Sequence, residues 1–183
     1  MSLIRPATES DLDTLVALEN RCFDGDKLSR RSFKSLIKPG AHLASVILVV
    51  AGYSIVLFRT GTSLARLYSI ALDPNYRGQG LAQALLADAE SEALARHCLF
   101  IRLEVRNDNP NAIALYQKLD YHVFDDIENY YEDGCAALRF EKRLHPEASQ
   151  IIQKAPAYYR QTTEFSCGPA ALMMAMANIR PEY

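Results

Sequence analysis

The sequence has no closely spaced pair of cysteines, and its four histidines show no metal-ligand spacing. The cysteines are widely separated along the chain: Cys22, Cys98, Cys135 and Cys167. Structural zinc sites use cysteine or histidine ligands at short, regular spacings, and this chain has none. We therefore expect no metal, and we expect reduced thiols, which suit the cytoplasm.

The sequence also lacks a signal-peptide core, a membrane-length apolar run and an excess of basic residues. Its first six residues form no apolar core, and the apolar run Val46 to Ala51 is far too short to span a bilayer. A formal net charge of -2 provides no basic field for a polyphosphate backbone. We expect a cytoplasmic protein with no membrane partner and no direct nucleic-acid partner, in which any anion site is local.

The composition that is present is that of a globular protein, with 49% hydrophobic and 23% charged residues in a chain of 183. Single domains most often contain about 100–150 residues, so we expect one domain with an appendage. We assign residues 1–144 to the domain, 145–157 to a linker and 158–183 to a short C-terminal segment.

Hydrophobic periodicity and turn residues predict the elements of the domain. Thr8 and Asp11 form a capping-box pattern at the start of the first helix, and Gly52 and Thr60-Gly61-Thr62 interrupt the strands. The expected strands cover residues 3–5, 42–50, 53–59, 65–72, 98–105, 121–125 and 136–143, and the expected helices cover 9–21, 32–38, 80–95 and 110–119. This order predicts an α/β fold with a mixed, mostly antiparallel central sheet and helices on both faces.

The segment Arg77-Gly78-Gln79-Gly80-Leu81-Ala82 connects the strand expected at 65–72 to the helix that follows. A helix N-terminus carries unpaired N–H groups and about half a positive charge, which suits a pyrophosphate, and glycines allow the backbone to approach it closely. By itself, a Gly-x-Gly turn before a helix is also typical of an ordinary tight turn or cap.

Within this segment, Arg77-x-x-Gly80-x-Ala82 resembles the coenzyme A signature of the GNAT acetyltransferase superfamily. Leu103 to Arg106, Ala112 to Tyr116 and Asn129-Tyr130-Tyr131 resemble the bacterial ribosomal-protein-alanine N-acetyltransferases. The resemblance covers residues 2–144 and implies the GNAT fold with acetyl-coenzyme A as cosubstrate. It also implies a primary amine as acceptor, with the α-amino group of a protein or peptide favoured and a ribosomal protein as one candidate.

The resemblance further implies the residues that bind the cosubstrate. Backbone groups of Ile70 and Leu72 would bond the pantetheine arm, and the segment from Arg77 to Ala82 would hold the pyrophosphate. Asn109 matches a position that contacts the coenzyme, although its place before Pro110 also explains it as a helix cap. Both roles can coexist.

By the same resemblance, Glu104 is the general base and Tyr116 the general acid. An α-amino group has a pKa of about 7.7–8.0, so a carboxylate can remove its proton, and a tyrosine of pKa about 10 can protonate the departing thiolate. Alternatively, Glu104 is an ion-pair partner on an edge strand, and Tyr116 is a packing residue between Ile113 and Leu119.

Two segments depart from the pattern of the ribosomal-protein enzymes. Cys22 to Lys27, in the region that helps to shape the acceptor site, is charged where those enzymes have aromatic and proline residues. Asp120 replaces a glycine of special backbone conformation, which aspartate tolerates better than most residues. A lysine side chain or a small-molecule amine is therefore an alternative acceptor. A coenzyme-binding or peptide-recognition module attached to a cysteine peptidase is an alternative function.

The peptidase alternative arises from the residues after Tyr158. The spacing of Gln161 and Cys167 resembles the opening of papain-like, bacteriocin-processing cysteine peptidase domains, in which the glutamine helps to form the oxyanion hole. A thiol at a helix N-terminus is a plausible nucleophile. No His or Asp follows Cys167 in the sequence, so we interpret the segment as a truncated fragment without peptidase activity. Alternatively, residues 170–177 form an amphipathic helix that packs on the domain.

Overall fold

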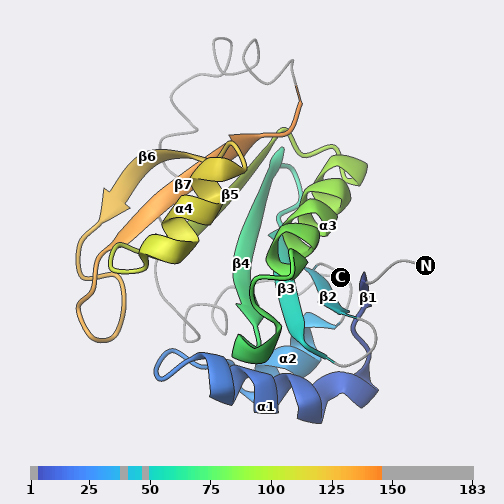
Figure 1. The fold of residues 1–183 in the computed structure, drawn as a ribbon. Coiled ribbons are helices and arrows are strands. Elements are labelled where there is room, and N and C mark those ends of the chain that lie inside the picture. The colour runs from blue at the N-terminus through green and yellow to red at the C-terminus, as the bar shows by residue number, and fades with distance from the viewer. Residues whose placement is uncertain (1–3, 38–40, 47–49, 146–183) are drawn as a thin grey trace, which may run out of the picture.

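The computed structural model describes residues 4–37, 41–46 and 50–145, and its centre is a seven-stranded sheet in the order β1-β2-β3-β4-β5-β7-β6 (Figure 1). The strands are β1 Ile4–Pro6, β2 Ala41–Val46, β3 Gly52–Phe58, β4 Leu64–Leu72, β5 Phe100–Arg106, β6 His122–Ile127 and β7 Ala137–Arg143. The helices are α1 Leu12–Cys22, α2 Arg30–Leu36, α3 Leu81–Ala95 and α4 Pro110–Lys118, with 3-10 turns at Glu9–Asp11 and Pro74–Tyr76. Nearly all of the expected linker, together with Gln161, Cys167 and the helix expected at 170–177, lies outside the described residues.

Strand pairing confirms the predicted mixed, mostly antiparallel sheet. β4 and β5 run parallel, and the other neighbouring strands run antiparallel. The parallel pair needs a crossover connection, which α3 supplies. The observed order of strands and helices is the one that the hydrophobic pattern predicts.

Helices cover both faces of the sheet, as the sequence predicts (Figure 1). On one face, α1 and α2 pack through Leu15, Leu18 and Phe33 in a cluster with residues of β3. On the other face, Leu86 of α3 and Tyr116 of α4 lie in a second cluster with residues of β5 and β7. Each helix buries one apolar stripe in this way, so the sheet forms the middle of three layers.

Two local expectations differ from the structure. Gly52 is the first residue of β3 rather than a break before it, and a Cβ there would lie 2.8 Å from the carbonyl oxygen of Ala71. Glycine therefore allows β3 to approach β4 closely. The helix α2 begins at Arg30 rather than at residue 32, because the Ser29 side chain accepts a hydrogen bond from the Ser32 N–H and caps the helix.

Asp120 has a left-handed φ of 63° directly after α4. This conformation confirms the special backbone geometry expected where related enzymes have glycine. Across the turn, the Tyr121 N–H donates to the carbonyl oxygen of Tyr116 at 3.0 Å, a contact that closes a helix at a left-handed residue. The backbone thus sets the end of α4, and aspartate accommodates it.

β4 and β5 part after a short paired stretch. Their parallel register begins at Leu64 opposite Phe100 and ends at Arg66 opposite Arg102, although both strands continue beyond that point. The β3–β4 register skips Tyr68, which is the extra residue of a β-bulge. A bulge bends a strand and increases its twist, so it accounts for the divergence of β4 from β5.

The carboxylate of Glu19 in α1 is buried, with only 2% of the residue exposed. It accepts hydrogen bonds from the Leu28 N–H at 2.8 Å and from the Tyr53 hydroxyl, which also contacts the Ser69 hydroxyl at 3.0 Å. These contacts connect α1 and the following loop to β3 and β4. Burial is the main cause that raises the pKa of Glu19 above its ordinary value of 4.5.

Replacing Glu19 by glutamine should change how stability depends on pH. Because the pKa of Glu19 is raised in the folded state, its contribution is fully present below pH 4.5 and is lost as the pH rises through the folded-state value. As the pH rises above 4.5, the wild type should lose stability relative to Glu19→Gln. The difference between their free energies of unfolding, measured by urea unfolding, should therefore shift in favour of Glu19→Gln. Glu9→Gln, at an exposed position, is the control for the loss of one carboxylate. A difference between Glu19→Gln and wild type that stays constant with pH would contradict this expectation.

Candidate active site

The loop after β4 is held in place by the nearly buried side chain of Asp73. Its carboxylate accepts a hydrogen bond from the Asn75 N–H at 3.0 Å and forms an ion pair with Arg21 of α1 at 2.9 Å. The Asp73 N–H donates to the carbonyl oxygen of Ala51 at 2.8 Å. The beginning of the loop is therefore fixed to α1 and to the residue before β3.

Gly78 and Gly80 form the turn into α3, and both have a left-handed φ of 77°. A Cβ at either position would meet no atom within 4 Å, so conformation rather than crowding favours glycine there. The first helical hydrogen bond runs from the Ala84 N–H to the Gly80 carbonyl oxygen at 3.0 Å, which leaves the N–H groups of Leu81 and Ala82 ahead of the ladder. The predicted segment therefore presents free backbone donors at the N-terminus of a 15-residue helix, which suits a pyrophosphate.

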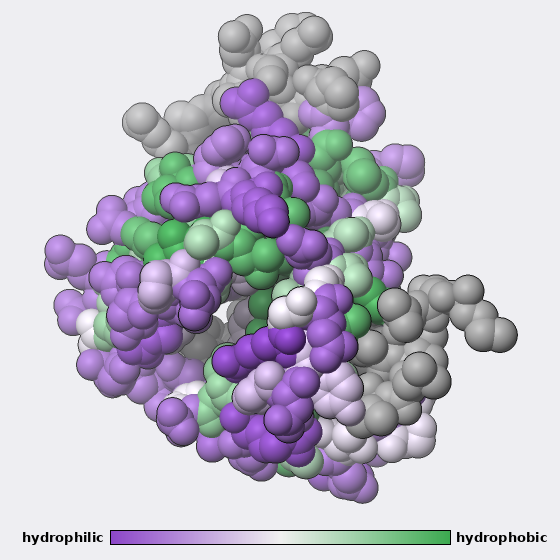
Figure 2. All heavy atoms as spheres, viewed as in Figure 1, coloured by the Kyte–Doolittle hydropathy of each residue, from purple (hydrophilic) through white to green (hydrophobic). Residues whose placement is uncertain are grey.

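The sheet opens beside this loop. Ile70 and Leu72, which are predicted to bond the pantetheine arm, lie in β4 beyond its last pair with β5. The space-filling view shows a hollow in the middle of this face (Figure 2). Arg77 and Gln79, from the predicted coenzyme segment, are exposed at the surface. The described residues thus offer an opened sheet edge next to the glycine turn before α3, an arrangement compatible with the predicted binding of an extended molecule with a pyrophosphate group.

Asn109 lies on the other side of the opening, after β5. Its Oδ1 accepts a hydrogen bond from the Ala112 N–H at 3.1 Å, which confirms the predicted cap of α4. Its predicted contact with the coenzyme stays a prediction.

Glu104 lies in β5 between β4 and β7, so the expectation of an edge strand is wrong. Its Oε2 accepts hydrogen bonds from Arg66 Nε at 3.1 Å and Arg66 Nη2 at 2.9 Å, and its Oε1 lies 3.7 Å from Arg139 Nε. The expected ion pair is therefore confirmed. It is compatible with a general-base role, because Oε1 accepts no hydrogen bond from any residue in the described part of the chain.

Tyr116 lies in α4 with 5% of the residue exposed. Its ring packs against those of Tyr121 and Phe140, with centroid distances of 5.7 Å and 5.8 Å, so the expected packing role is confirmed. Burial raises the pKa of Tyr116 above its ordinary value of 10, and the hydroxyl therefore keeps its proton at neutral pH. A tyrosine in this state can still act as a proton donor.

The side chains of the two predicted catalytic residues, Glu104 of β5 and Tyr116 of α4, lie on opposite faces of the sheet. Leu103 and Val105 belong to the same core cluster as Tyr116. Side chains alternate between the two faces along a strand, so Glu104 points away from that cluster. In an acyl transfer that takes place between β4 and β5, a carboxylate on one face of the sheet can accept a proton from the attacking group. A protonated phenol on the other face can donate a proton to the leaving group.

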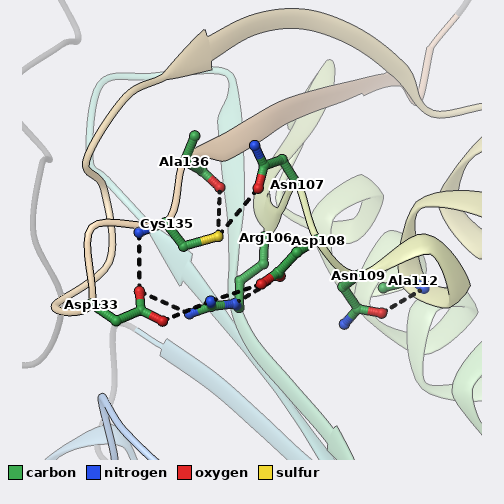
Figure 3. A network of polar contacts seen from close by, with 8 residues as sticks. All are labelled: Arg106, Asn107, Asp108, Asn109, Ala112, Asp133, Cys135 and Ala136. Carbon is green, nitrogen blue, oxygen red and sulfur yellow. Dashed lines mark hydrogen bonds and ion pairs between the residues drawn. The ribbon is translucent and has the colours of Figure 1, made fainter.

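Arg106 connects the turn after β5 to the loop between β6 and β7 (Figure 3). Its guanidinium contacts the carboxylates of Asp108 at 3.0 Å and Asp133 at 2.7 Å, and it lies 4.9 Å from the ring centroid of Tyr131. Both carboxylates are more than half exposed, so solvent screens these ion pairs and their main effect is to orient the loop. The loop that carries Tyr130 and Tyr131 is thereby held beside the turn that leads into α4.

Arg66 is a further residue of the site, and no motif in the sequence points to it. Arg66 lies in β4 with 18% of its side chain exposed, and its Nη2 also donates to the Tyr130 hydroxyl at 3.0 Å. A charged residue within a largely apolar strand is the available signal, because such a charge is buried only beside a partner. That partner, Glu104, is 38 positions away in sequence, and parallel pairing of β4 with β5 brings the two together.

Metal ions, membrane spans and disulfides can be assessed for residues 4–37, 41–46 and 50–145. No group of three or more His, Cys, Asp or Glu side chains in these ranges could hold a metal ion. No helix in the same ranges is long and apolar enough to cross a membrane. The described cysteines, Cys22, Cys98 and Cys135, are free thiols.

Comparison with known protein families gives two matches. The Acetyltransferase (GNAT) family model matches residues 12–121, more than half of the chain. A Peptidase_C39 like family matches residues 156–183, which lie outside the described residues.

Curated relatives match over a short stretch. An acetyltransferase from Sodalis glossinidius is 42% identical over 60 residues, which are 33% of this chain and 42% of that protein. An acetyltransferase from Yersinia pestis (strain Pestoides F) is 42% identical over 60 residues, 33% of this chain and 43% of that protein. The match thus spans less than half the length of these relatives.

Solved structures match over most of the described chain. The ribosomal-protein-S18-alanine N-acetyltransferase from Escherichia coli is 29% identical with a TM-score of 0.69, over 79% of this chain and 94% of that one. Ard1 from Thermoplasma volcanium is 24% identical with a TM-score of 0.69, over 76% of this chain and 95% of that one, and this similarity shows the fold alone.

The left-handed backbone at Gly80 can be tested by substitution. Gly80→Ala forces a Cβ into a left-handed conformation, which should cost about 1–2 kcal/mol of the free energy of unfolding. Gly25→Ala is the matched control, because it also meets no atom within 4 Å and lacks a left-handed φ. We expect urea unfolding to show a loss for Gly80→Ala and no loss for Gly25→Ala. Equal effects of the two substitutions would contradict the assignment of strain to the turn before α3.

Proposed function

Because the chain belongs to the GNAT acetyltransferase family, we propose that it is an N-acetyltransferase that transfers the acetyl group of acetyl-coenzyme A to a primary amine. The observation that carries this proposal is the parting of β4 and β5 beside the glycine turn of α3. This opening has Glu104 on one face of β5 and Tyr116 in the cluster on the other. The favoured acceptor is the α-amino group of a protein or peptide.

The similarity to the Escherichia coli enzyme supports this choice of acceptor. Its name identifies the acceptor as an alanine of ribosomal protein S18, and the identity of 29% extends over 94% of its length. An N-terminal amine with a pKa of about 7.7–8.0 is largely an ammonium at neutral pH, so transfer requires removal of a proton. We propose a peptide or protein N-terminus, with a ribosomal protein as one candidate substrate.

The residues of the site have separate roles in this proposal. Bound acetyl-coenzyme A supplies an acetyl group activated as a thioester. The turn at Gly78 and Gly80 and the N-terminus of α3 hold its pyrophosphate, and the free edge of β4 bonds the pantetheine arm. Glu104 takes a proton from the ammonium, directly or through a water, and the Tyr116 hydroxyl gives a proton to the departing sulfur.

The charged loop after α1 favours a second class of acceptor. Related enzymes have aromatic and proline residues there, whereas this chain has the exposed side chains of Asp24 and Lys27 and a partly exposed Asp26. A lysine side chain or a small amine is therefore the alternative acceptor. Binding of acetyl-coenzyme A without transfer would define a third function, that of a recognition module attached to a peptidase.

The acceptor can be identified by following coenzyme A release with a peptide that begins with alanine and with its N-terminally blocked, lysine-containing copy. We expect turnover with the free peptide only. Tyr116→Phe should lower kcat roughly 100-fold, since it removes the proton donor. Tyr121→Phe is the matched control, because that buried hydroxyl bonds to Glu90 at 2.9 Å and is not assigned to the reaction.

Other outcomes of this assay would separate the alternatives. Turnover with the blocked copy would identify lysine as the acceptor. Tight binding of acetyl-coenzyme A without turnover on any amine would support the recognition module. Equal kcat values for Tyr116→Phe and Tyr121→Phe would remove Tyr116 from the mechanism.

For residues 158–183 we propose the beginning of a cysteine-peptidase-like domain. The family match at 156–183 and the spacing of Gln161 and Cys167 support this assignment. Such a domain uses a cysteine thiol as its nucleophile, so we expect any peptide cleavage by the chain to be lost in Cys167→Ala. Cleavage that persists in Cys167→Ala would contradict this assignment.

A further inference from the structure

Arg66 and Glu104 form an ion pair at the point where β4 and β5 part. Arg66 is the last residue of β4 in register with β5, and Glu104 lies two residues beyond its partner Arg102. Both side chains are largely buried, with 18% and 11% exposed. A buried arginine and a buried carboxylate each require a partner, so the pair is stable only as a unit.

Arg66 donates hydrogen bonds to only one of the two carboxylate oxygens of Glu104. Nε and Nη2 of Arg66 both donate to Oε2 of Glu104, at 3.1 Å and 2.9 Å. Oε1 accepts no hydrogen bond from the described residues, and its nearest cationic contact is Arg139 Nε at 3.7 Å. The planar guanidinium thus fixes one oxygen and leaves the other able to accept a proton or a water.

Arg66 also contacts the loop between β6 and β7. Its Nη2 donates to the Tyr130 hydroxyl at 3.0 Å. The ring of the neighbouring Tyr131 lies against the Arg106 guanidinium. Arg106 in turn bridges to Asp133 of the same loop and to Asp108 before α4 (Figure 3). The orientation of Glu104 is therefore connected through Arg66 to a loop that is itself held in place.

We propose that Arg66 is a positioning residue for acetyl transfer, which holds the Glu104 carboxylate by one oxygen so that the other faces the acceptor amine or its water. This inference rests on the proposed function and extends it to a residue of the neighbouring strand. Arg66 acts through Glu104 and need not touch the substrate.

A double-mutant cycle tests the proposal. The kcat and KM values of wild type, Arg66→Met, Glu104→Gln and the double variant are measured by varying acetyl-coenzyme A at saturating acceptor peptide, and by varying the peptide at saturating acetyl-coenzyme A. We expect Arg66→Met to lower kcat about tenfold in the wild-type background and less than about twofold when Glu104 is already glutamine, because the two residues act as a unit. The KM for acetyl-coenzyme A should not change, and Arg66→Lys should restore part of the kcat.

Arg102→Met is the matched control. Arg102 lies opposite Arg66 in the β4–β5 register, has 19% of its side chain exposed and forms its own ion pair with Glu141. Arg102→Met should lower the stability of the protein about as much as Arg66→Met does, but it should leave kcat unchanged. Thermal unfolding of each variant verifies that it is folded at the temperature at which kcat is measured.

The outcomes separate the two proposals. Equal losses of kcat from Arg66→Met in both backgrounds, or an equal loss from Arg102→Met, would overturn the positioning role while acetyl transfer stands. A folded wild type that acetylates no amine would overturn the proposed function and this inference with it.

Discussion

The arrangement of the site depends on the early end of the β4–β5 pairing. The two strands share a register only from Leu64 to Arg66 of β4, and the bulge at Tyr68 turns β4 away. If the pairing continued, the backbone groups near Ile70 and Leu72 would be used within the sheet. The parting leaves this stretch of β4 unpaired with β5, between the turn of α3 and the cap of α4.

Charge around this opening is organised by contacts between elements that are distant in sequence. Arg66 of β4 holds Glu104 of β5 and reaches Tyr130 in the loop after β6. Arg106 then fixes that loop to the turn before α4. Pairing also compensates the cost of placing an arginine and a carboxylate in a largely buried position. The same contacts that stabilise the charges therefore orient the proposed base.

Around the site, several residues adopt a left-handed backbone conformation, and one carboxylate is buried. The fold by itself requires neither. Gly78 and Gly80 use left-handed backbone to direct N–H groups outward, and Asp120 uses it to end α4 next to Tyr116. Glu19 is buried and accepts a hydrogen bond from the Leu28 N–H of the charged loop after α1, and its raised pKa makes that contact sensitive to pH. Such features concentrate where a protein has to hold a ligand or a loop, since packing elsewhere tolerates simpler choices.

The sequence by itself determined the order of strands and helices, because periodicity, caps and turn residues act over short distances. It also identified the turn from Arg77 to Ala82 and the cap at Asn109, whose chemistry is local to one helix end. Tertiary structure alone decided the tight approach at Gly52 and the central position of β5. Only the folded sheet brought Arg66 to Glu104 across 38 positions, because strand register is set by the whole hydrophobic pattern rather than by neighbouring residues.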